Sequence, residues 1–251
     1  MVRAEGNGAT LGPAPAIEAR RLVKWYGSQP ALRGIDLAVA PGEILALFGS
    51  NGAGKTTLLR ILAGRVRPTG GTGQVAGHPL DRDGEGVRRA LGVLAHGHQL
   101  YEALTARENL AFAAAMLGLD RPTERVSQVL VKVGLEAAAE ARVRTFSSGM
   151  KRRLAVAKLM LREPKVILLY EPYASLDLQA TKVLEEFLMA SKAAGATTIL
   201  ATHNLTMGFG VADRLAILRK GRLVFEGRRE DTSLDAFRSL FVLHGECEES
   251  A

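Results

Sequence analysis

One stretch of this 251-residue chain decides its fold: Gly49-Ser50-Asn51-Gly52-Ala53-Gly54-Lys55-Thr56-Thr57. An apolar run at residues 44–48 precedes it and a helix-forming run at residues 57–62 follows it, so a strand enters the loop and a helix leaves it. This setting separates a phosphate-binding loop from a chance glycine-rich turn. The glycines let backbone N–H groups turn toward phosphates, and the positive end of the following helix points the same way. The stretch therefore predicts a nucleoside triphosphate site.

The loop also assigns roles to single side chains. Lys55 would reach the β and γ phosphates, and the hydroxyl of Thr56 would ligate Mg²⁺. The candidate nucleotide-binding residues of the loop are Gly49, Ser50, Asn51, Gly52, Ala53, Gly54, Lys55, Thr56 and Thr57. An ordinary strand-to-helix turn is the alternative, and the filling of every fixed position speaks against it.

The composition fits a cytosolic nucleotide-binding protein. The length allows one large α/β domain or two small lobes. Hydrophobic residues make up 47% of the chain, and no stretch approaches the roughly 20 uninterrupted apolar residues that a bilayer crossing needs. The N-terminus lacks the apolar core of a secretory signal, and Cys247 is the only cysteine. We therefore expect a cytosolic protein with no internal disulfide and no cysteine-based metal site.

The chain carries a net charge of +7, from 33 Lys and Arg residues against 26 Asp and Glu residues. Basic runs occur at residues 20–21, 88–89, 151–153 and 228–229, but they are scattered and are not interleaved with aromatic residues. This pattern favours an ordinary solvated surface, with a membrane-proximal partner as the next explanation. No nucleic acid partner is expected.

Hydrophobic periodicity predicts a chain of alternating strands and helices. We expect strands near residues 16–26, 35–40, 44–48, 73–75, 91–94, 165–170 and 197–201, and a closing hairpin at residues 215–218 and 223–225. We expect helices at residues 57–62, 105–117, 122–132 and 178–194, the second of them opened by the capping box Thr105-Ala106-Arg107-Glu108. The continuous apolar runs at residues 166–169 and 197–201 are typical of strands buried in a parallel sheet.

Two further polar residues follow directly after buried strands. Glu171 and His203 should emerge at the carboxyl edge of the sheet, where ligands of open α/β sheets bind. A carboxylate there can orient and deprotonate an attacking water, and an imidazole can hydrogen-bond the γ phosphate. Each residue alone has a structural alternative, a helix N-terminal charge or a cap, but their joint position beside the loop favours the catalytic interpretation.

Short motifs at residues 146–150, 171–177 and 201–203 follow the phosphate loop along the chain. In this order they resemble the motifs of the ATP-binding subunits of ABC transporters, and the resemblance covers nearly the whole chain. Residues 146–150, Phe-Ser-Ser-Gly-Met, are similar to the signature segment of that family. Residues 171–177 resemble the end of its Walker B motif and its D-loop, and residues 201–203 its switch histidine. Tyr26 matches the aromatic residue that stacks on adenine.

The resemblance implies an α/β fold: a P-loop NTPase core with a mixed, mainly parallel sheet, a small antiparallel β subdomain and an inserted helical subdomain. It implies one ABC-type domain over residues 1–251. The nucleotide-binding core with the β subdomain would take residues 1–95 and 163–245, and the loop and helical signature subdomain residues 96–162. Residues 246–251 would form a tail.

The resemblance also implies a mechanism that needs two ATP-binding subunits, in a homodimer or a heterodimer. ATP with Mg²⁺ would lie between the loop of one subunit and Ser147, Ser148 and Gly149 of the other, and ATP hydrolysis would use Glu171 and His203. Asp177 would serve the D-loop. Integral membrane permease subunits are the implied partners, docked in a groove near residues 96–104, so the implied location is peripheral, on the cytoplasmic face of the cell membrane.

The chain departs from the family pattern in three motifs. Tyr170 stands where the family has the Asp that holds Mg²⁺, and a phenol, with a reference pKa of about 10, is neutral at pH 7. We therefore expect weakened Mg²⁺ binding and reduced ATPase activity. The position of the glutamine that serves Mg²⁺ and the lytic water is taken by His96, a candidate metal ligand, or by Gln99 after a small shift. Ser148 and Met150 replace the usual Gly and Gln of the signature.

Residues 94–96 and 104–110 are similar to the haem-exporter ATPase subunit of bacterial cytochrome c maturation, so haem export is our first expectation for the transported substrate. The alternative is an ABC-2-type drug or polysaccharide exporter, which residues 171–173 fit equally. A second alternative is a weakly hydrolysing nucleotide-binding regulatory subunit. The transported molecule contacts the membrane subunit, so no residue of this chain identifies it.

Overall fold

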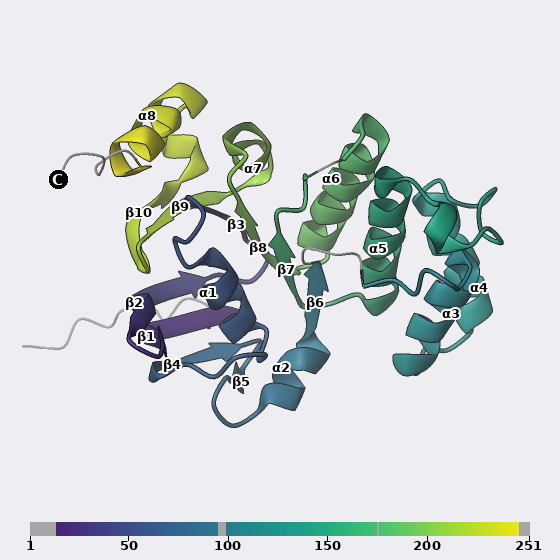
Figure 1. The fold of residues 1–251 in the computed structure, drawn as a ribbon, viewed down its shortest axis with the longest axis horizontal. Coiled ribbons are helices and arrows are strands. Elements are labelled where there is room, and N and C mark those ends of the chain that lie inside the picture. Colours follow the sequence, from purple (N-terminus) through teal and green to yellow (C-terminus); the bar gives the residue numbers. More distant parts are fainter. Residues whose placement is uncertain (1–13, 95–98, 175, 246–251) are drawn as a thin grey trace, which may run out of the picture.

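A computed structural model describes residues 14–94, 99–174 and 176–245 of the chain. Two sheets and a group of helices make up the molecule, with the helices of residues 106–193 gathered on one side and the last helix, residues 234–245, on the other (Figure 1). The main sheet has six strands in the order β10-β9-β3-β8-β7-β6. Its strands are β3 (Ile44–Phe48), β6 (Leu91–Leu94), β7 (Val166–Tyr170), β8 (Thr197–Thr202), β9 (Arg214–Arg219) and β10 (Arg222–Arg228).

The main sheet is parallel except at one edge. Strand β3 pairs in parallel with β8 and β9, and β7 pairs in parallel with β8 and β6, whereas β10 is antiparallel to β9. Strand β3 is buried along its whole length, as a strand with both faces covered must be. Because parallel strands end at the same edge, the loops after β3, β7 and β8 are brought together there.

The second sheet has four strands in the order β2-β1-β4-β5, and the pairs β1–β2, β1–β4 and β4–β5 are all antiparallel. Its strands are β1 (Ile17–Tyr26), β2 (Gln29–Val39), β4 (Gly70–Val75) and β5 (His78–Pro79). Helix α1 (Lys55–Leu62) contacts both sheets and buries Leu58, Leu59, Ile61 and Leu62 between them. This sheet is the small antiparallel β unit that the sequence resemblance implies.

The remaining helices cover the two faces of the main sheet and its far end. They are α2 (Gly84–Ala90), α3 (Ala106–Met116), α4 (Pro122–Lys132), α5 (Ser148–Arg162), α6 (Leu178–Ala193), α7 (Leu205–Val211) and α8 (Leu234–Gly245). Two short 3₁₀ turns lie at Val143–Thr145 and Arg229–Asp231. The pleat of β3 sends Leu45 and Leu47 toward α1, and Phe48 to the opposite face against Phe237 of α8.

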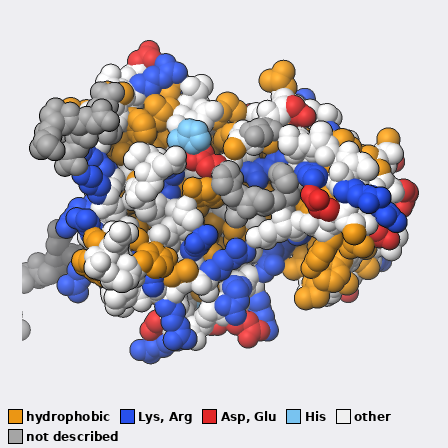
Figure 2. All heavy atoms as spheres, in the orientation of Figure 1, with side chains coloured by type: hydrophobic (Ala, Val, Ile, Leu, Met, Phe, Trp, Pro, Cys, Tyr) orange, Lys and Arg blue, Asp and Glu red, His pale blue; other side chains and the backbone are white. Residues whose placement is uncertain are grey.

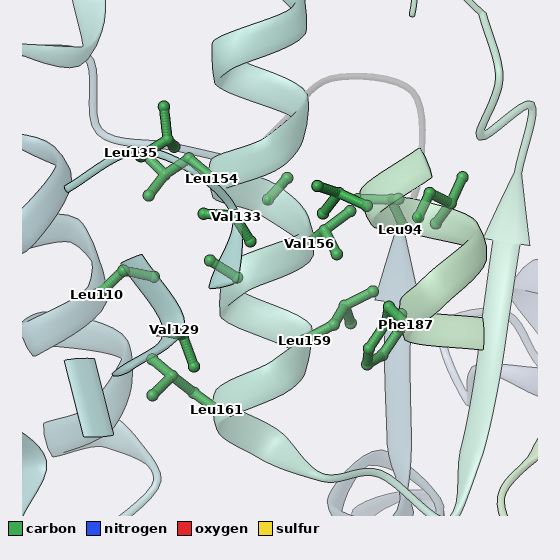
Figure 3. Packing of buried hydrophobic residues seen from close by; sticks show 14 of the residues in the cluster. Leu94, Leu110, Val129, Val133, Leu135, Leu154, Val156, Leu159, Leu161 and Phe187 are labelled. Carbon is green, nitrogen blue, oxygen red and sulfur yellow. The ribbon is translucent and has the colours of Figure 1, made fainter. Parts of the chain in front are cut away.

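Helix α5 is the centre of the largest apolar cluster. Figure 3 shows Leu154, Val156, Leu159 and Leu161 of α5 among side chains of α3, α4, α6 and β6. Helix α3 begins at the predicted capping box, in which Thr105 accepts a hydrogen bond from the N–H of Glu108 and Glu108 accepts one from the N–H of Thr105. Helices α3 and α4 therefore pack as a unit onto α5, which in turn packs onto the sheet.

The structure differs from the sequence prediction at a few elements. Strand β2 begins at Gln29 rather than near residue 35, because residues 29–33 also pair with β1. The predicted strands at residues 91–94 and 73–75 lie in different sheets, since residues 91–94 pair with β7 and residues 73–75 pair with β1. The sequence prediction also missed the helices α2, α7 and α8. The glycine-rich first turn of α2, at Gly84 and Gly86, is typical of a loop.

Candidate functional site

The phosphate loop connects the carboxyl end of β3 to α1, as its sequence predicts. Gly54, the residue before the helix, has φ +110°, and a Cβ atom there would lie 2.7 Å from the carbonyl oxygen of Ala31. Gly52 has φ +81°, which is also unfavourable for other residues. Helix α1 starts with no side-chain cap and no acidic residue in its first turn. Among the described residues, no side chain caps the first N–H groups of α1, so these groups can bind phosphate oxygens.

Lys55 is the charged group of this loop. Its side chain is buried, with a relative exposure of 3%, and Nζ donates hydrogen bonds to the carbonyl oxygens of Gly49 and of Ser50, the latter at 3.2 Å. Burial lowers the pKa of Lys55, and the nearby carboxylate of Glu171 acts in the opposite direction. A bound phosphate would place negative charge beside this buried ammonium group and so favour its charged form. The loop thus combines backbone donors with one desolvated cation.

Glu171 follows β7 and is buried in a strained backbone position. Its φ is +43°, a left-handed value that costs a non-glycine residue about 1 kcal/mol or more. Its N–H donates to the carbonyl oxygen of Ala201 at 2.8 Å, which holds the residue against the end of β8. The residue is 6% exposed, and its negative charge acts to raise the pKa of Lys55. Glu171 and Lys55 therefore belong to one site.

The carboxylate of Glu171 is oriented by the two residues that end and follow β8. Oε2 accepts hydrogen bonds from Oγ1 of Thr202 at 3.0 Å and from the N–H of His203 at 3.3 Å. Oε1 lies 2.9 Å from Nδ1 of His203, whose side chain is 69% exposed. The carboxylate is held by Thr202 and by the backbone of His203, and the imidazole next to it is open to solvent. Together these two groups are suited to hold an attacking water. The structure thus brings Glu171 and His203 together, as their strand-end positions predict.

Thr202 is a residue of this site that the sequence prediction did not single out. It is fully buried at the end of β8, and its hydroxyl both donates to Glu171 and accepts from the N–H of Asn204 at 3.0 Å. A polar residue at the end of a strand, directly before the predicted site residue His203, is the signal that could have found it. Its role is to orient the carboxylate.

Magnesium would depend mainly on the nucleotide at this site. Tyr170 ends β7, is half-buried and packs against the cluster around α1. Within the described ranges, no group of three or more His, Cys, Asp and Glu side chains could hold a metal ion. Mg²⁺ usually needs only one or two protein ligands when phosphates and waters complete its shell. The hydroxyl of Thr56 therefore fits a Mg²⁺ ion that arrives with the triphosphate, and the ion would neutralise phosphate charge during transfer.

The signature residues lie at the start of α5. Ser147 is the N-cap of α5, and its Oγ accepts a hydrogen bond from the N–H of Met150 at 3.2 Å. Ser147 and Ser148 are exposed, whereas Gly149 is buried, and a Cβ atom at Gly149 would lie 2.3 Å from Oδ2 of Asp177. Asp177 in turn caps α6 by accepting from the N–H of Ala180 at 2.7 Å. Gly149 and Asp177 thus bring the starts of α5 and α6 together, while the hydrogen bonds of Lys55 go to Gly49 and Ser50.

The other predicted site residues lie in separate places. Tyr26 ends β1 in the second sheet, is 48% exposed and has Nζ of Lys24 5.1 Å from the centre of its ring. Gln99 has φ +48°, and its carbonyl oxygen accepts a hydrogen bond from Nζ of Lys158 at 2.8 Å. His96 lies outside the described residues. The roles proposed for Tyr26, His96 and Gln99 therefore remain predictions.

A groove of about 540 Å³ lies between β6 and the helices α3 and α5. Its apolar part includes Tyr101, Phe112 and Met116, which are 54%, 46% and 74% exposed, and the rings of Tyr101 and Phe112 are in edge contact. Among the described residues that line it, the charged ones are all basic: Arg65, Arg88, Lys158 and Arg162. Figure 2 shows basic side chains gathered over the region of α2 and hydrophobic ones over α3. The groove is thus apolar on one side and positively charged on the other.

A phosphate loop on β3, a buried carboxylate on β7 and a histidine after β8 define the chain as a P-loop nucleotide-binding protein with a mixed α/β fold. The family model described as "ABC transporter" matches residues 32–174, more than half of the chain. The chain therefore belongs to the ABC transporter family, as an ATP-binding subunit. This confirms the family resemblance seen in the sequence.

The relatives are ATP-binding proteins of bacterial transport systems. Nod factor export ATP-binding protein I of Paraburkholderia xenovorans (strain LB400) is 37% identical over 217 residues, which cover 86% of this chain and 71% of the relative. The daunorubicin/doxorubicin resistance ATP-binding protein DrrA of Streptomyces peucetius is 36% identical, over 86% of this chain and 66% of the relative. The chain thus spans about two thirds of the length of these curated relatives.

Solved structures agree with this assignment. An ATP-binding subunit of an ABC transporter superposes with a TM-score of 0.81 at 32% identity, covering 92% of this chain and 95% of the other. The cbiO1 protein of Clostridium perfringens, described as part of the ABC transporter complex cbiONQ, gives a TM-score of 0.78 at 26% identity, over 92% and 93% of the two chains. The predicted P-loop NTPase fold is confirmed.

Proposed function

We propose that this chain is the ATP-hydrolysing subunit of an ABC exporter. The observation that carries the proposal is the constellation of Lys55, Glu171 and His203 at one sheet edge, in a chain of the ABC transporter family. Lys55 and the loop amides bind the phosphates, Glu171 orients and activates water, and His203 faces the γ phosphate. Tyr26, Thr56 and either His96 or Gln99 complete the proposed contacts to ATP and Mg²⁺.

The relatives change the expected substrate class. Their names refer to Nod factor export and to resistance to daunorubicin and doxorubicin. These functions favour the alternative of an ABC-2-type drug or polysaccharide exporter over haem export, the first expectation from residues 94–96 and 104–110. The prediction from that short segment gave too much weight to a loop pattern, because this chain does not itself contact the transported molecule.

We also propose that the chain acts in a pair of ATP-binding subunits, and that the helical subdomain spans residues 96–162. Support for the pair comes from Ser147 and Gly149, whose contacts go to α5 and to Asp177 rather than to Lys55 of the same chain. An exposed helix N-terminus that faces outward can bind the phosphates of a second subunit's ATP. Support for the subdomain comes from the packing of α3 and α4 onto α5.

The groove between β6, α3 and α5 is the proposed contact with the membrane permease. Among the described residues, no helix combines the length and the apolar character needed to cross a bilayer, so transport would require another subunit. The basic rim and the exposed side chains of Tyr101, Phe112 and Met116 fit a short amphipathic segment that carries carboxylates. The proposed location is therefore peripheral, on the cytoplasmic face of the cell membrane.

This docking is testable by charge reversal in the groove. We expect the double variant R65E/R88E to co-purify with its permease about tenfold less than the wild-type chain, because like charges across the interface repel. The measurement is quantitative pull-down from detergent-solubilised membranes, with the permease identified by mass spectrometry. The double variant R20E/R82E is the matched control, since it makes the same change of charge at exposed positions outside the groove. Equal recovery with both variants would exclude the groove, and absence of any permease with the wild-type chain would contradict the proposed function.

Tyr170 gives a second test. We expect Tyr170→Asp to raise Mg²⁺-dependent ATPase turnover by about tenfold and to lower the Mg²⁺ concentration needed for half-maximal rate, because the new carboxylate adds a charged ligand at the end of β7. Steady-state phosphate release with the purified chain measures this. Tyr170→Phe is the control, since it changes the hydroxyl without adding charge. If Tyr170→Asp brings no gain, weak Mg²⁺ binding at this position is not what limits the enzyme. If the wild-type chain binds ATP without turnover, the regulatory alternative is favoured.

A further inference from the structure

Helix α5 buries two adjacent arginine side chains in its second turn. Arg152 and Arg153 are 4% and 7% exposed. Burial lowers the pKa of Arg152 to about 10, so its guanidinium group is still charged at neutral pH. A buried cation is retained only where fixed acceptors compensate for the lost water. The acceptors of these two side chains therefore indicate what each arginine does.

The two arginines reach in different directions. Nε of Arg152 donates to the carbonyl oxygen of Pro172 at 3.1 Å, and Nη2 donates to the carbonyl oxygen of Glu171 at 3.2 Å. Nη1 of Arg153 instead donates to the carbonyl oxygens of Val133 and Gly134, both at 3.0 Å, at the end of α4. Arg152 thus binds the backbone that follows β7, whereas Arg153 binds the backbone at the end of α4.

The backbone of Glu171 is fixed from two sides. On one side its N–H is bonded to Ala201 of β8 at 2.8 Å. On the other side its carbonyl oxygen accepts from the N–H of Ala174, at 3.2 Å, and from Arg152. Since the φ of Glu171 is +43°, the surroundings must hold this conformation, and Arg152 is the contact that comes from α5.

The same helix contacts the far end of this segment. Gly149, in the first turn of α5, packs so closely on Asp177 that any Cβ atom at position 149 would clash with Oδ2. The first two turns of α5 therefore contact the segment at residues 171–177 near both its ends, through Gly149 and Arg152. Because an α-helix moves as a rigid element over this length, a displacement of its N-terminus also reaches Arg152.

We propose that Arg152 is a positioning residue that ties the backbone of Glu171 to the signature helix. This rests on the proposed function, in which Ser147 and Gly149 meet the ATP held by a second subunit. When that nucleotide reaches the start of α5, it changes the position of Glu171 in the same chain. Each ATP site therefore influences the position of the carboxylate that serves the other ATP site. Glu171 remains the residue that faces water, and Arg152 acts through its backbone.

The first test compares amide hydrogen exchange in R152Q and R153Q, a matched pair of buried arginine substitutions. We expect R152Q to speed exchange at the amides of Glu171 and Ala174 by about tenfold, and R152K, which keeps a cation, to give a smaller effect. R153Q should leave these two amides unchanged and affect Leu135 instead. Equal exchange at Glu171 in R152Q and the wild-type chain would overturn the proposal, and so would the same increase in R153Q. Mass-spectrometric exchange on the purified chain needs no turnover, so this result stands even if the chain proves not to hydrolyse ATP.

The second test addresses the link between the two sites. A ¹⁵N-labelled chain carrying K55A is mixed with an excess of wild-type chain, so that ATP is bound by the wild-type loop and meets Ser147 of the labelled chain. We expect ATP to slow exchange at Glu171 of the labelled chain about threefold, and the effect to vanish in K55A/R152Q but persist in K55A/R153Q. A persistent effect in K55A/R152Q would refute the link. Failure of the chains to associate with ATP would refute the proposed pairing instead, which analytical ultracentrifugation distinguishes.

Steady-state kinetics add a readout that loss of stability alone would not move. We expect R152Q to lower kcat about tenfold while KM for ATP stays within about twofold, because the loop that binds ATP is untouched. R153Q should keep kcat within about threefold despite a similar fall in thermal stability. Equal kcat losses in R152Q and R153Q would contradict the positioning role.

Discussion

Replacing Lys55 by alanine is expected to weaken ATP binding by about 100-fold, equivalent to about 2.7 kcal/mol, and to abolish measurable ATPase activity. The physical reason is that Lys55 is the buried cation of the loop, held by the carbonyl oxygens of Gly49 and Ser50 next to the phosphate-facing amides. Fluorescence titration with a labelled ATP analogue and phosphate-release assays measure the two effects.

The control for this prediction is Lys182→Ala, which removes an equally charged side chain that is 77% exposed on α6. It should leave ATP binding within about twofold of the wild-type value, because exposed ion pairs contribute little. Circular dichroism should show both variants folded, since Lys55 packs in a loop rather than in the apolar core. Unchanged ATP affinity in K55A would mean that the loop does not bind the nucleotide, and the assignment of the site would fail.

Replacing Glu171 by glutamine is expected to lower kcat by about 100-fold or more with little change in ATP affinity, the range typical for loss of a general base. The amide can still accept a hydrogen bond from Thr202, so the side chain keeps its place, but it can no longer take a proton from water. Because ATP then stays bound, the proposed pair of subunits should accumulate. Single-turnover hydrolysis and size-exclusion chromatography with ATP test both parts.

The matched control is Glu186→Gln on α6, where the side chain is 63% exposed and pairs with Lys182. Turnover should be unaffected there. The variant Thr202→Val provides an intermediate case, since it removes the hydroxyl that orients the carboxylate while Glu171 remains. Turnover of Glu171→Gln at the wild-type rate would assign the base to another residue, and His203 would be the first candidate.

Much of the fold followed from local patterns. The continuous apolar runs predicted β3, β7 and β8, and the capping box placed the start of α3 within a residue. Strand β2 was predicted too short and α2 was missed, because their sequences contain turn-forming residues whose effect is overridden by pairing with β1 and by packing onto β5 and β6. Propensity describes a residue and its neighbours, whereas these elements are stabilised by distant parts of the chain.

The sequence by itself determined the phosphate loop and the family, because the loop is contiguous and its pattern needs only neighbouring residues between one strand and one helix. Only the tertiary structure decided how Glu171 is held. Its partners Thr202 and His203 lie on the neighbouring strand end, and Arg152 reaches it from α5 through carbonyl oxygens that any residue types could supply. A hydrogen bond to a backbone carbonyl oxygen does not depend on the residue type of its acceptor. That is the physical reason why the phosphate loop could be identified from the sequence, whereas the contacts that hold Glu171 could not.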